Sequence, residues 1–250
     1  MNIPEYFSQR ASVRNYTAEP IAAADIEAML AAAAHAPNTG NMQLCSVVVT
    51  DDPAQLKALQ PCHFSQPAIM NAPVALTFCA DIHRFERWCE CRDAKPGFDN
   101  LQMLLAAMMD ATIFAQQFVT IAEMNGLGTC YLGTTLYNAK EIAEVLHLPA
   151  GVVPVMTVTV GNPEGVPADA GRLPIEAIVH HGVYHDYTDA DIDRLYAEKE
   201  NRADSQAFVA ENNKATLAQV FADVRYPAAV NREFSAKLSQ FLAAAGFNLS

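Results

Sequence analysis

The stretch between Asp99 and Gly126 constrains the fold more than any other part of the sequence. In the helix predicted over 99–125, Leu, Met, Ala, Ile and Phe occupy almost every face. Asp99 is a plausible N-cap, and Gly126 can supply the left-handed residue that follows the last turn. Because a helix that is apolar all round is buried all round, we expect a central helix. Either other elements of the chain cover it, or a second subunit covers part of it.

The remaining elements alternate along the first part of the chain. A chain of 250 residues, 51% of them hydrophobic, has enough apolar material for a proper core. Alternation of strands and helices indicates an α/β or α+β class. Strands are predicted at 45–50, 73–80 and 153–161, and further helices at 25–36, 53–60, 81–90 and 138–147.

The end of the chain changes character. Residues 185–250 are rich in charge and contain amphipathic helical patterns whose apolar stripes need a partner surface. No Gly/Ser linker precedes them. We therefore expect a single domain over 1–250, with residues 185–250 forming a helical dimerisation arm within it.

The formal net charge of −12 argues against polyanionic partners, because such a surface repels nucleic acid and anionic membranes. The opening "MNIPEYFSQR" lacks the apolar core of a secretory signal. Asp110 interrupts the apolar stretch 101–124, whose longest uncharged run falls short of the roughly 18 residues a membrane span needs. We expect a soluble, cytoplasmic protein with neither nucleic acid nor membrane as a partner.

The cysteines and clustered histidines do not predict a metal site. The six cysteines lie in apolar surroundings and are typical of reduced intracellular thiols. Cys89 and Cys91 do not have zinc-ligand spacing. His180 and His181 would point to opposite faces of a strand, so a surface loop is the better interpretation.

Several short segments offer groups that could bind a ligand. In "RASVR", Arg10, Ser12 and Arg14 would share one face of an extended segment, although two solvated arginines are the plainer alternative. In "APNTGNMQL" (36–44), Asn38 and Asn41 lie in an amide-rich turn at the end of a strand, where α/β ligands often bind. An ordinary turn is the alternative there.

Three further segments complete the set. Asn71 stands just before a buried strand. The glycines of "GLGTCYLGT" (126–134) allow close backbone approach to a ligand, or simply form a helix C-cap followed by a strand. Arg172 is a lone cation entering an apolar segment, or else a surface arginine before a turn.

The chemistry that these segments can supply is binding. They provide cations for a phosphate and amides for a flat heterocycle, without a nucleophile, a general-base pair or metal ligands. The chain also has no G-x-G-x-x-G after its first strand, no P-loop and no G-x-S-x-G. A site of this kind indicates that a cofactor carries the reaction, so no catalytic side chain is predicted.

In this order the segments resemble the nitroreductase-like flavoprotein family. "RASVRNYTAEPI" resembles the family's R-x-S-x-R opening, and "AAHAPNTGNMQ" resembles its A-P-S-x-x-N-x-Q turn. "IMNAPVALTFCAD", "AEMNGLGTCYLG" and "VPVMTVTVGNPEG" are similar to its later blocks. The segment "GRLPIEAIVHHGVYHDYT" and the charged helices after it are similar to the NADPH-dependent flavin reductase branch, the oxygen-insensitive major nitroreductase type.

The resemblance, which covers the whole chain, implies a fold and an activity. It implies an α+β fold with a central, mostly antiparallel sheet, a long buried helix and a C-terminal helical arm. It implies a homodimer with one FMN per subunit at the interface. NADPH or NADH would reduce the FMN, and flavin N5 would pass the hydride to nitroaromatics, quinones or free flavin in a ping-pong reaction. A flavin-binding protein without turnover is the alternative.

The resemblance also implies which residues contact FMN. Arginines of the opening segment would meet the phosphate and ribityl chain, polar residues of the turn and of "MNAPV" would bond the isoalloxazine rim, and backbone after the long helix would lie near the ring or phosphate. Arg172 would close on the phosphate. In full, the predicted contacts are Arg10, Ala11, Ser12, Val13, Arg14, Asn38, Thr39, Asn41, Asn71, Tyr131, Leu132, Gly133 and Arg172.

The sequence departs from the family pattern at two places. "PNTGN" stands where the branch usually has serines, so flavin contacts from this turn are expected from the backbone. Ala170 stands where the branch tends to place a lysine, two residues before the closing arginine. Losing that cation would make the flavin harder to reduce unless another group substitutes for it.

Overall fold

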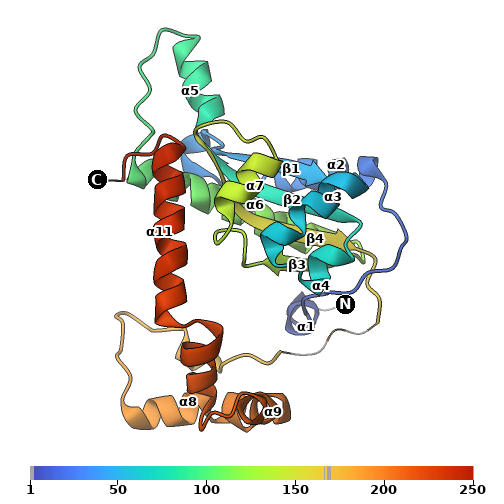
Figure 1. Cartoon of the computed structure of the whole chain (residues 1–250), viewed down its shortest axis with the longest axis vertical. Helices are drawn as coiled ribbons and strands as arrows, with labels where there is room; N and C mark the ends of the chain where they lie inside the picture. The colour runs from blue at the N-terminus through green and yellow to red at the C-terminus, as the bar shows by residue number, and fades with distance from the viewer. Residues whose placement is uncertain (1–2, 166, 168–169, 250) are drawn as a thin grey trace. The chain divides into compact units, whose positions relative to one another are not determined.

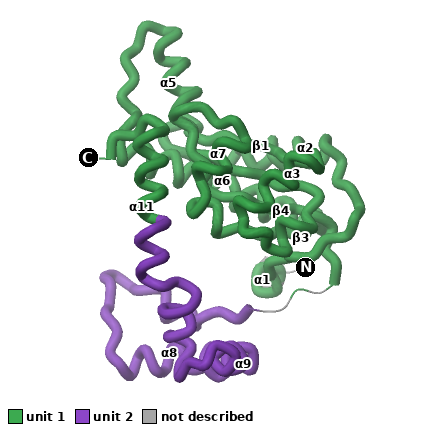
Figure 2. The backbone as a smooth tube through the Cα atoms, viewed as in Figure 1, with its two compact units in different colours: residues 1–167, 235–250 green, residues 168–234 purple. Residues whose placement is uncertain are grey.

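The computed structural model describes residues 3–165, 167 and 170–249. It divides into two compact units, one formed by residues 1–167 and 235–250 and the other by residues 168–234 (Figure 2). The second unit therefore begins before the predicted arm at 185, and the end of the chain belongs to the first unit. That the whole chain is a single domain stays a prediction.

A four-stranded sheet forms the centre of the first unit (Figure 1). The strand order is β1-β2-β4-β3, and every neighbouring pair is antiparallel. The strands are β1 (Cys45–Thr50), β2 (Val74–Asp81), β3 (Gly128–Leu132) and β4 (Val152–Gly161). This sheet confirms the predicted α+β class. Every residue of β2 is buried, as its continuous apolar run predicts.

Helices lie between these strands in sequence and form most of the second unit. Those of the first unit are α1 (Ile3–Ser8), α2 (Ala23–Ala33), α3 (Pro53–Leu59), α4 (Pro67–Met70), α5 (His83–Glu90), α6 (Leu101–Met124) and α7 (Ala139–Val145), with short 3₁₀ turns η1 (Thr39–Asn41) and η2 (Pro61–His63). Those of the second are η3 (Ile175–Ala177), α8 (Asp189–Asn201), α9 (Ala203–Glu211), α10 (Leu217–Gln219) and the π-helical turn η4 (Val220–Arg225). Helix α11 (Ala228–Ala244) begins in the second unit and ends in the first.

The ends of α6 are set by local capping. The side chain of Asn100 accepts a hydrogen bond from the backbone N–H of Met103 at 3.1 Å, so Asn100 is the N-cap and the predicted Asp99 is one residue off. The carbonyl of Asp99 instead accepts from the N–H of Asn248. At the other end Gly126 has φ +84°, which confirms its left-handed conformation.

Helix α6 packs along one face of the sheet and contacts all four strands and α2. The buried side of the helix is rich in alanine, which lets its backbone approach the strands closely. Phe118 and Phe114 of α6 lie with their ring centroids 6.0 and 5.5 Å from that of Phe78 on β2. These contacts join α2, α6 and the sheet in one apolar core.

The opposite side of α6 is exposed in this chain. Leu101, Leu105, Met109 and Ile113 are between 41% and 57% exposed, and we call these four residues the α6 stripe. The expectation of burial all round is therefore met on one side only. By length and composition α6 is also apolar enough to cross a membrane, and 44% of its apolar window is buried within the described residues.

The other face of the sheet is covered by α3, α4 and α7. Leu56 and Ile69 pack there with Leu132 of β3, while Leu59 packs with Ile142 of α7. The first unit is thus a three-layer structure with the sheet in the middle. This arrangement follows from β2, whose two faces are both apolar.

His63 is buried in the layer formed by α3, α4 and α7. Its Nδ1 lies 2.9 Å from the hydroxyl of Thr134, and its Nε2 makes no hydrogen bond to any of the described residues. Burial lowers the pKa of His63 to about 4. The imidazole is therefore neutral in the folded protein near pH 7.

We predict that acid destabilises the fold through His63. Between pH 6.5 and pH 4 the unfolded chain binds a proton that the folded chain does not, so the free energy of unfolding should fall as the pH drops through this window. The full effect is roughly 3 kcal/mol. Urea unfolding at several pH values gives the free energy of unfolding as a function of pH. This dependence should be weaker for His63→Gln than for the unchanged protein. The control His35→Gln, at an exposed site, should keep the strong pH dependence of the unchanged protein. The same pH dependence in all three proteins would contradict the role given to His63.

Candidate functional site

The segment that carries Arg10, Ser12 and Arg14 runs beside β3. The backbone N–H of Val13 donates to the carbonyl of Thr129 at 2.9 Å. Farther on, the hydroxyl of Tyr16 lies 2.8 Å from the Thr159 hydroxyl and donates to the carbonyl of Val13 at 2.8 Å. These bonds fix the opening segment on the edge of the sheet.

Two glycines allow this close approach. A Cβ on Gly128 would lie 2.7 Å from the side chain of Val13, and one on Gly161 would lie 2.6 Å from the ring of Tyr16. Both distances are shorter than real Cβ contacts. Gly128, the second glycine of "GLGT", therefore lets the opening segment pack against β3. This packing role was not predicted from the sequence.

Arg10 lies in a partly buried polar cluster. Its Nη2 is 3.2 Å from the Oε1 of Glu123, which also accepts a hydrogen bond from the hydroxyl of Thr129. That Nη2 atom is buried and makes no hydrogen bond with good geometry to the described residues. Ser12 is half-buried and Arg14 is exposed. A partly buried guanidinium with further N–H groups beside an exposed arginine fits an anionic ligand.

The phenol of Tyr131 belongs to the same cluster. Burial raises the pKa of Tyr131 above its ordinary value, while the nearby charge of Arg10 acts in the opposite direction. The phenol therefore stays protonated, and it donates to the side chain of Gln116 at 3.3 Å. Its position places residues 131–133, at the end of β3, next to Arg10.

Asn71 also lies near this place. It ends α4 and is exposed, and its neighbour Ala72 packs against Val13 and Tyr16. The structure thus gathers three of the predicted segments along one strand. We call this group the β3 cradle, defined by residues 10–14, 71 and 131–133.

The predicted turn residues Asn38, Thr39 and Asn41 form a separate cluster. Asp110 of α6 accepts hydrogen bonds from the backbone N–H and the hydroxyl of Thr39 at 2.8 and 2.9 Å, and from the N–H of Leu44 at 3.2 Å. Sequence reasoning missed this role. The signal was present as Asp110, one of two acids in a largely apolar helix, but an acid in this position also reads simply as an interruption of the apolar run.

Within one chain the turn and the β3 cradle are far apart. Asp110 holds the turn and Glu123 contacts the cradle, and these two residues lie about 20 Å apart along α6. The structure therefore brings the predicted contacts of the first unit into two groups, one beside the middle of α6 and the other at its C-terminal end.

Arg172 belongs to the second unit. With Ala170, Lys199 and Arg202 it lines a cavity of about 270 Å³, and its Nη1 donates to the carbonyl of Gly171 at 2.6 Å. Arg202 is paired with Asp204 at 3.0 Å. Two cations that the sequence analysis did not single out therefore accompany Arg172.

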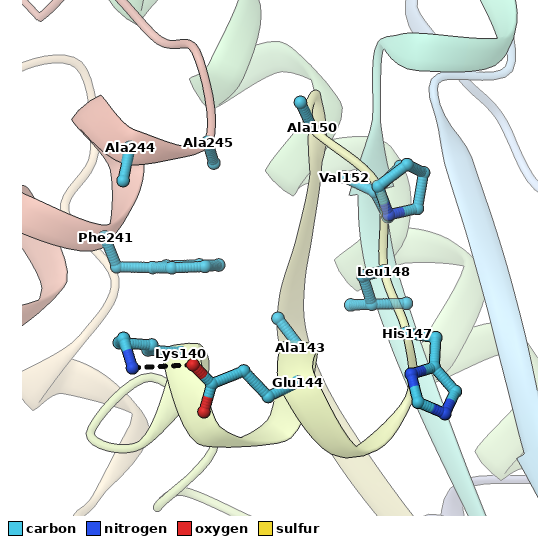
Figure 3. A pocket seen from close by; sticks show the side chains of 11 residues that line it. Lys140, Ala143, Glu144, His147, Leu148, Ala150, Val152, Phe241, Ala244 and Ala245 are labelled. Atoms are coloured by element: carbon cyan, nitrogen blue, oxygen red, sulfur yellow. Dashed lines mark hydrogen bonds and ion pairs between the residues drawn. The ribbon is translucent and has the colours of Figure 1, made fainter.

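A cavity of about 500 Å³ lies between α7 and the end of α11 (Figure 3). Its walls are mainly apolar, with Phe241 and Leu148 facing an exposed ion pair in which the Nζ of Lys140 is 2.6 Å from the Oε1 of Glu144. These side chains fix no ligand chemistry, and the cavity is separate from the β3 cradle.

The thiols of the sheet are not poised as nucleophiles. Burial raises the pKa of Cys45 to about 11 and that of Cys79 to about 12, so both are protonated near neutral pH. Burial also raises the pKa of Cys130, beside the cradle. Among the described residues no three His, Cys, Asp or Glu side chains are grouped as metal ligands.

Comparison with known proteins shows what this chain is similar to. It matches the model of the nitroreductase family over residues 7–162. It is 35% identical over 175 residues to an FMN reductase (NAD(P)H) of Bacillus subtilis, covering 69% of this chain and 70% of the relative. An oxygen-insensitive NADPH nitroreductase of Salmonella typhimurium is 34% identical over 173 residues, with coverage of 69% and 70%. The crystal structure of an oxidoreductase from Bacteroides fragilis superposes on this chain with a TM-score of 0.96. That protein is 46% identical in sequence, and the match covers 98% of this chain and 100% of that chain.

We predict that Gly128→Ala disturbs the β3 cradle, because the added methyl group would overlap the side chain of Val13. The overlap should lower the free energy of unfolding by roughly 1–3 kcal/mol. Gly97→Ala is the control, since a Cβ there meets nothing within 4 Å. Urea unfolding of both variants tests this, and a Gly128→Ala protein as stable as the control would contradict the close packing.

Proposed function

The chain belongs to the nitroreductase family, and we propose that it is an FMN-dependent oxidoreductase that takes electrons from NAD(P)H. The observation that carries this proposal is the β3 cradle, where the partly buried guanidinium of Arg10, paired with Glu123 through its Nη2, lies beside the exposed Arg14. Cations and close-approaching backbone suit a flat cofactor that carries a phosphate. The names of the relatives, an FMN reductase and an NADPH nitroreductase, support the same cofactor and donor.

The residues of the cradle divide by chemistry. Arg10, Ser12 and Arg14 offer charged and hydroxyl donors for the phosphate and ribityl chain, and Asn71 offers an amide to the ring. Bound FMN supplies a two-electron carrier whose N5 accepts and delivers a hydride. The protein's part is therefore to bind and orient. Nitroaromatics, quinones and free flavin are the proposed acceptors, in a ping-pong order.

A homodimer would complete the site. The α6 stripe exposes four large apolar side chains on a helix that otherwise packs in the core. The turn at 38–44 and the β3 cradle lie too far apart in one chain to hold the same ring system, as their separation of about 20 Å along α6 indicates. A second copy packed on the stripe would supply a second turn, so we propose that FMN binds at a dimer interface.

The second unit supports NADPH as the donor. Lys199 and Arg202 line one cavity with Arg172, where the three cations outnumber the one acid of the lining, Glu198, in a chain whose net charge is −12. Such a local group of cations suits a phosphate that NADPH carries and NADH lacks. That Arg172 also closes on the FMN phosphate stays a prediction.

We predict that the purified protein is yellow and releases about one FMN per chain on denaturation. Arg14→Ala removes a charge-assisted contact of roughly 1.5–3 kcal/mol, which corresponds to a tenfold to hundredfold loss of FMN affinity. Fluorescence titration of FMN-free protein measures this, with the exposed-loop variant Arg92→Ala as the control. A colourless protein that cannot be reconstituted would overturn the proposal.

Activity separates this proposal from a flavin-binding protein without turnover. Oxidation of NADPH, and then of NADH, should be followed with menadione, nitrofurazone and free FMN as acceptors. Alternating reduction and oxidation at one site should give parallel double-reciprocal lines. Bound FMN with no oxidation of either nicotinamide would favour the alternative.

We predict that Met109→Glu breaks the dimer, because it places a charge in the middle of the α6 stripe. Sedimentation velocity at micromolar concentration should show a dimer for the unchanged protein and a monomer with weakened FMN retention for the variant. Ala58→Glu adds the same charge to α3, on the other side of the sheet, and should stay dimeric. An unchanged protein that is monomeric while holding FMN would rule out the interface site.

A further inference from the structure

The turn between α2 and β1 has a demanding backbone. Gly40, Asn41 and Gln43 all have φ between +54° and +57°, in the left-handed region that non-glycine residues rarely adopt. Two non-glycine residues in this conformation need surrounding contacts that hold them there. The nearest backbone bonds, from the N–H of Met42 to the carbonyl of Thr39 and from Cys45 to Gln43, are short-range only.

Asp110 supplies the contacts from α6 that close the turn, and Arg84 of α5 adds a second long-range contact by donating from its Nη2 to the carbonyl oxygens of Gln43 and Cys45. Asp110 is only 2% exposed, and its two oxygens take separate ends of the turn. Oδ1 accepts from the N–H and the hydroxyl of Thr39, and Oδ2 accepts from the N–H of Leu44. Three donors on one buried carboxylate satisfy it without a cation. Because Asp110 lies on the rigid α6, these bonds fix the conformation of the turn relative to the core.

This arrangement decides which groups of the turn remain for a ligand. Thr39 gives both its amide and its hydroxyl hydrogens to Asp110. The side-chain oxygens of Asn38 and Asn41 accept from Gln43, through its backbone N–H at 3.2 Å and its Nε2 at 3.3 Å. The Nδ2 groups of Asn38 and Asn41 therefore remain as side-chain donors that the turn can direct outward. A flavin rim, with carbonyl oxygens and ring nitrogens, accepts such donors.

We propose that Asp110 is the positioning residue of the cofactor site. It acts through the turn, holding Asn38 and Asn41 as amide donors for the isoalloxazine rim, and makes no contact with the cofactor itself. This inference rests on the proposed FMN site and adds a residue that none of the expected contacts includes. It also reassigns Thr39 from a ligand contact to a link between Asp110 and the turn.

The test compares three full-length variants. Asp110→Asn keeps the size of the side chain but replaces one acceptor oxygen with a donor, so at least one of the three bonds is lost and a donor faces a donor. Thr39→Val removes only the hydroxyl bond and guards against a misfolded Asp110 variant. Asp52→Ala is the destabilised control, because Asp52 caps α3 through the N–H of Gln55 and lies outside the turn.

The expected result is selective. Asp110→Asn should weaken FMN binding by roughly tenfold to a hundredfold, and Thr39→Val by only a few-fold. In FMN-free protein, hydrogen exchange should speed up in the peptide covering 38–44 before other segments. The visible circular dichroism of bound FMN should change in Asp110→Asn, since it reports the groups around the ring, and should stay unchanged in Asp52→Ala.

Each outcome has a clear meaning. If Asp110→Asn binds FMN with unchanged affinity and dichroism while the unchanged protein binds it well, the positioning role is wrong and the FMN site stands. If both Asp110→Asn and Asp52→Ala lose affinity in proportion to their loss of stability, Asp110 is a stabilising residue only, and the inference fails. If the unchanged protein does not bind FMN, the proposed function itself fails, whereas fast exchange at 38–44 in Asp110→Asn would still show that Asp110 holds the turn.

Discussion

The packing of α6 against the sheet is the contact on which the rest of the first unit depends. Ala107, Ala111 and Ala115 recur every fourth residue on its buried side, so the helix can lie close to the strands at no cost in side-chain entropy. Once the alanine side of α6 packs on the sheet, the directions of all its remaining side chains are set. The α6 stripe must face outward, Asp110 must face the turn after α2, and Glu123 must face the opening segment.

Periodic and apolar features could be predicted from the sequence because they depend on neighbours along the chain. β1 has the predicted bounds at 45–50, and the continuous apolar run near 73–80 is a fully buried strand. The turn glycine Gly126 was also foreseen. The exact cap of α6 was not, because Asp99 and Asn100 are both good capping residues and only the folded geometry shows which reaches the N–H of Met103.

The polar contacts of the site could not be predicted, because their partners are distant in sequence. The bonds from Thr39 and Leu44 to Asp110 join residues separated by 71 and 66 positions. The pairing of Arg10 with Glu123 spans nearly half the chain. Sequence patterns identified the donors in "RASVR" and "PNTGN", but the acids that orient them lie in an apolar helix, where a single charge carries no periodic signal.

These acids bear on how a chain with net charge −12 would build the proposed anion site. Glu123 offsets part of the charge of Arg10, which weakens its attraction for a phosphate, but the ion pair also restrains the guanidinium beside the proposed site. Holding a long side chain in place in advance reduces the entropy lost on binding. Asp110 does the same for the amides of the turn. Since one rigid helix carries both acids, the two halves of the proposed site keep a constant separation. A ligand that needs both halves then requires a second copy of that helix.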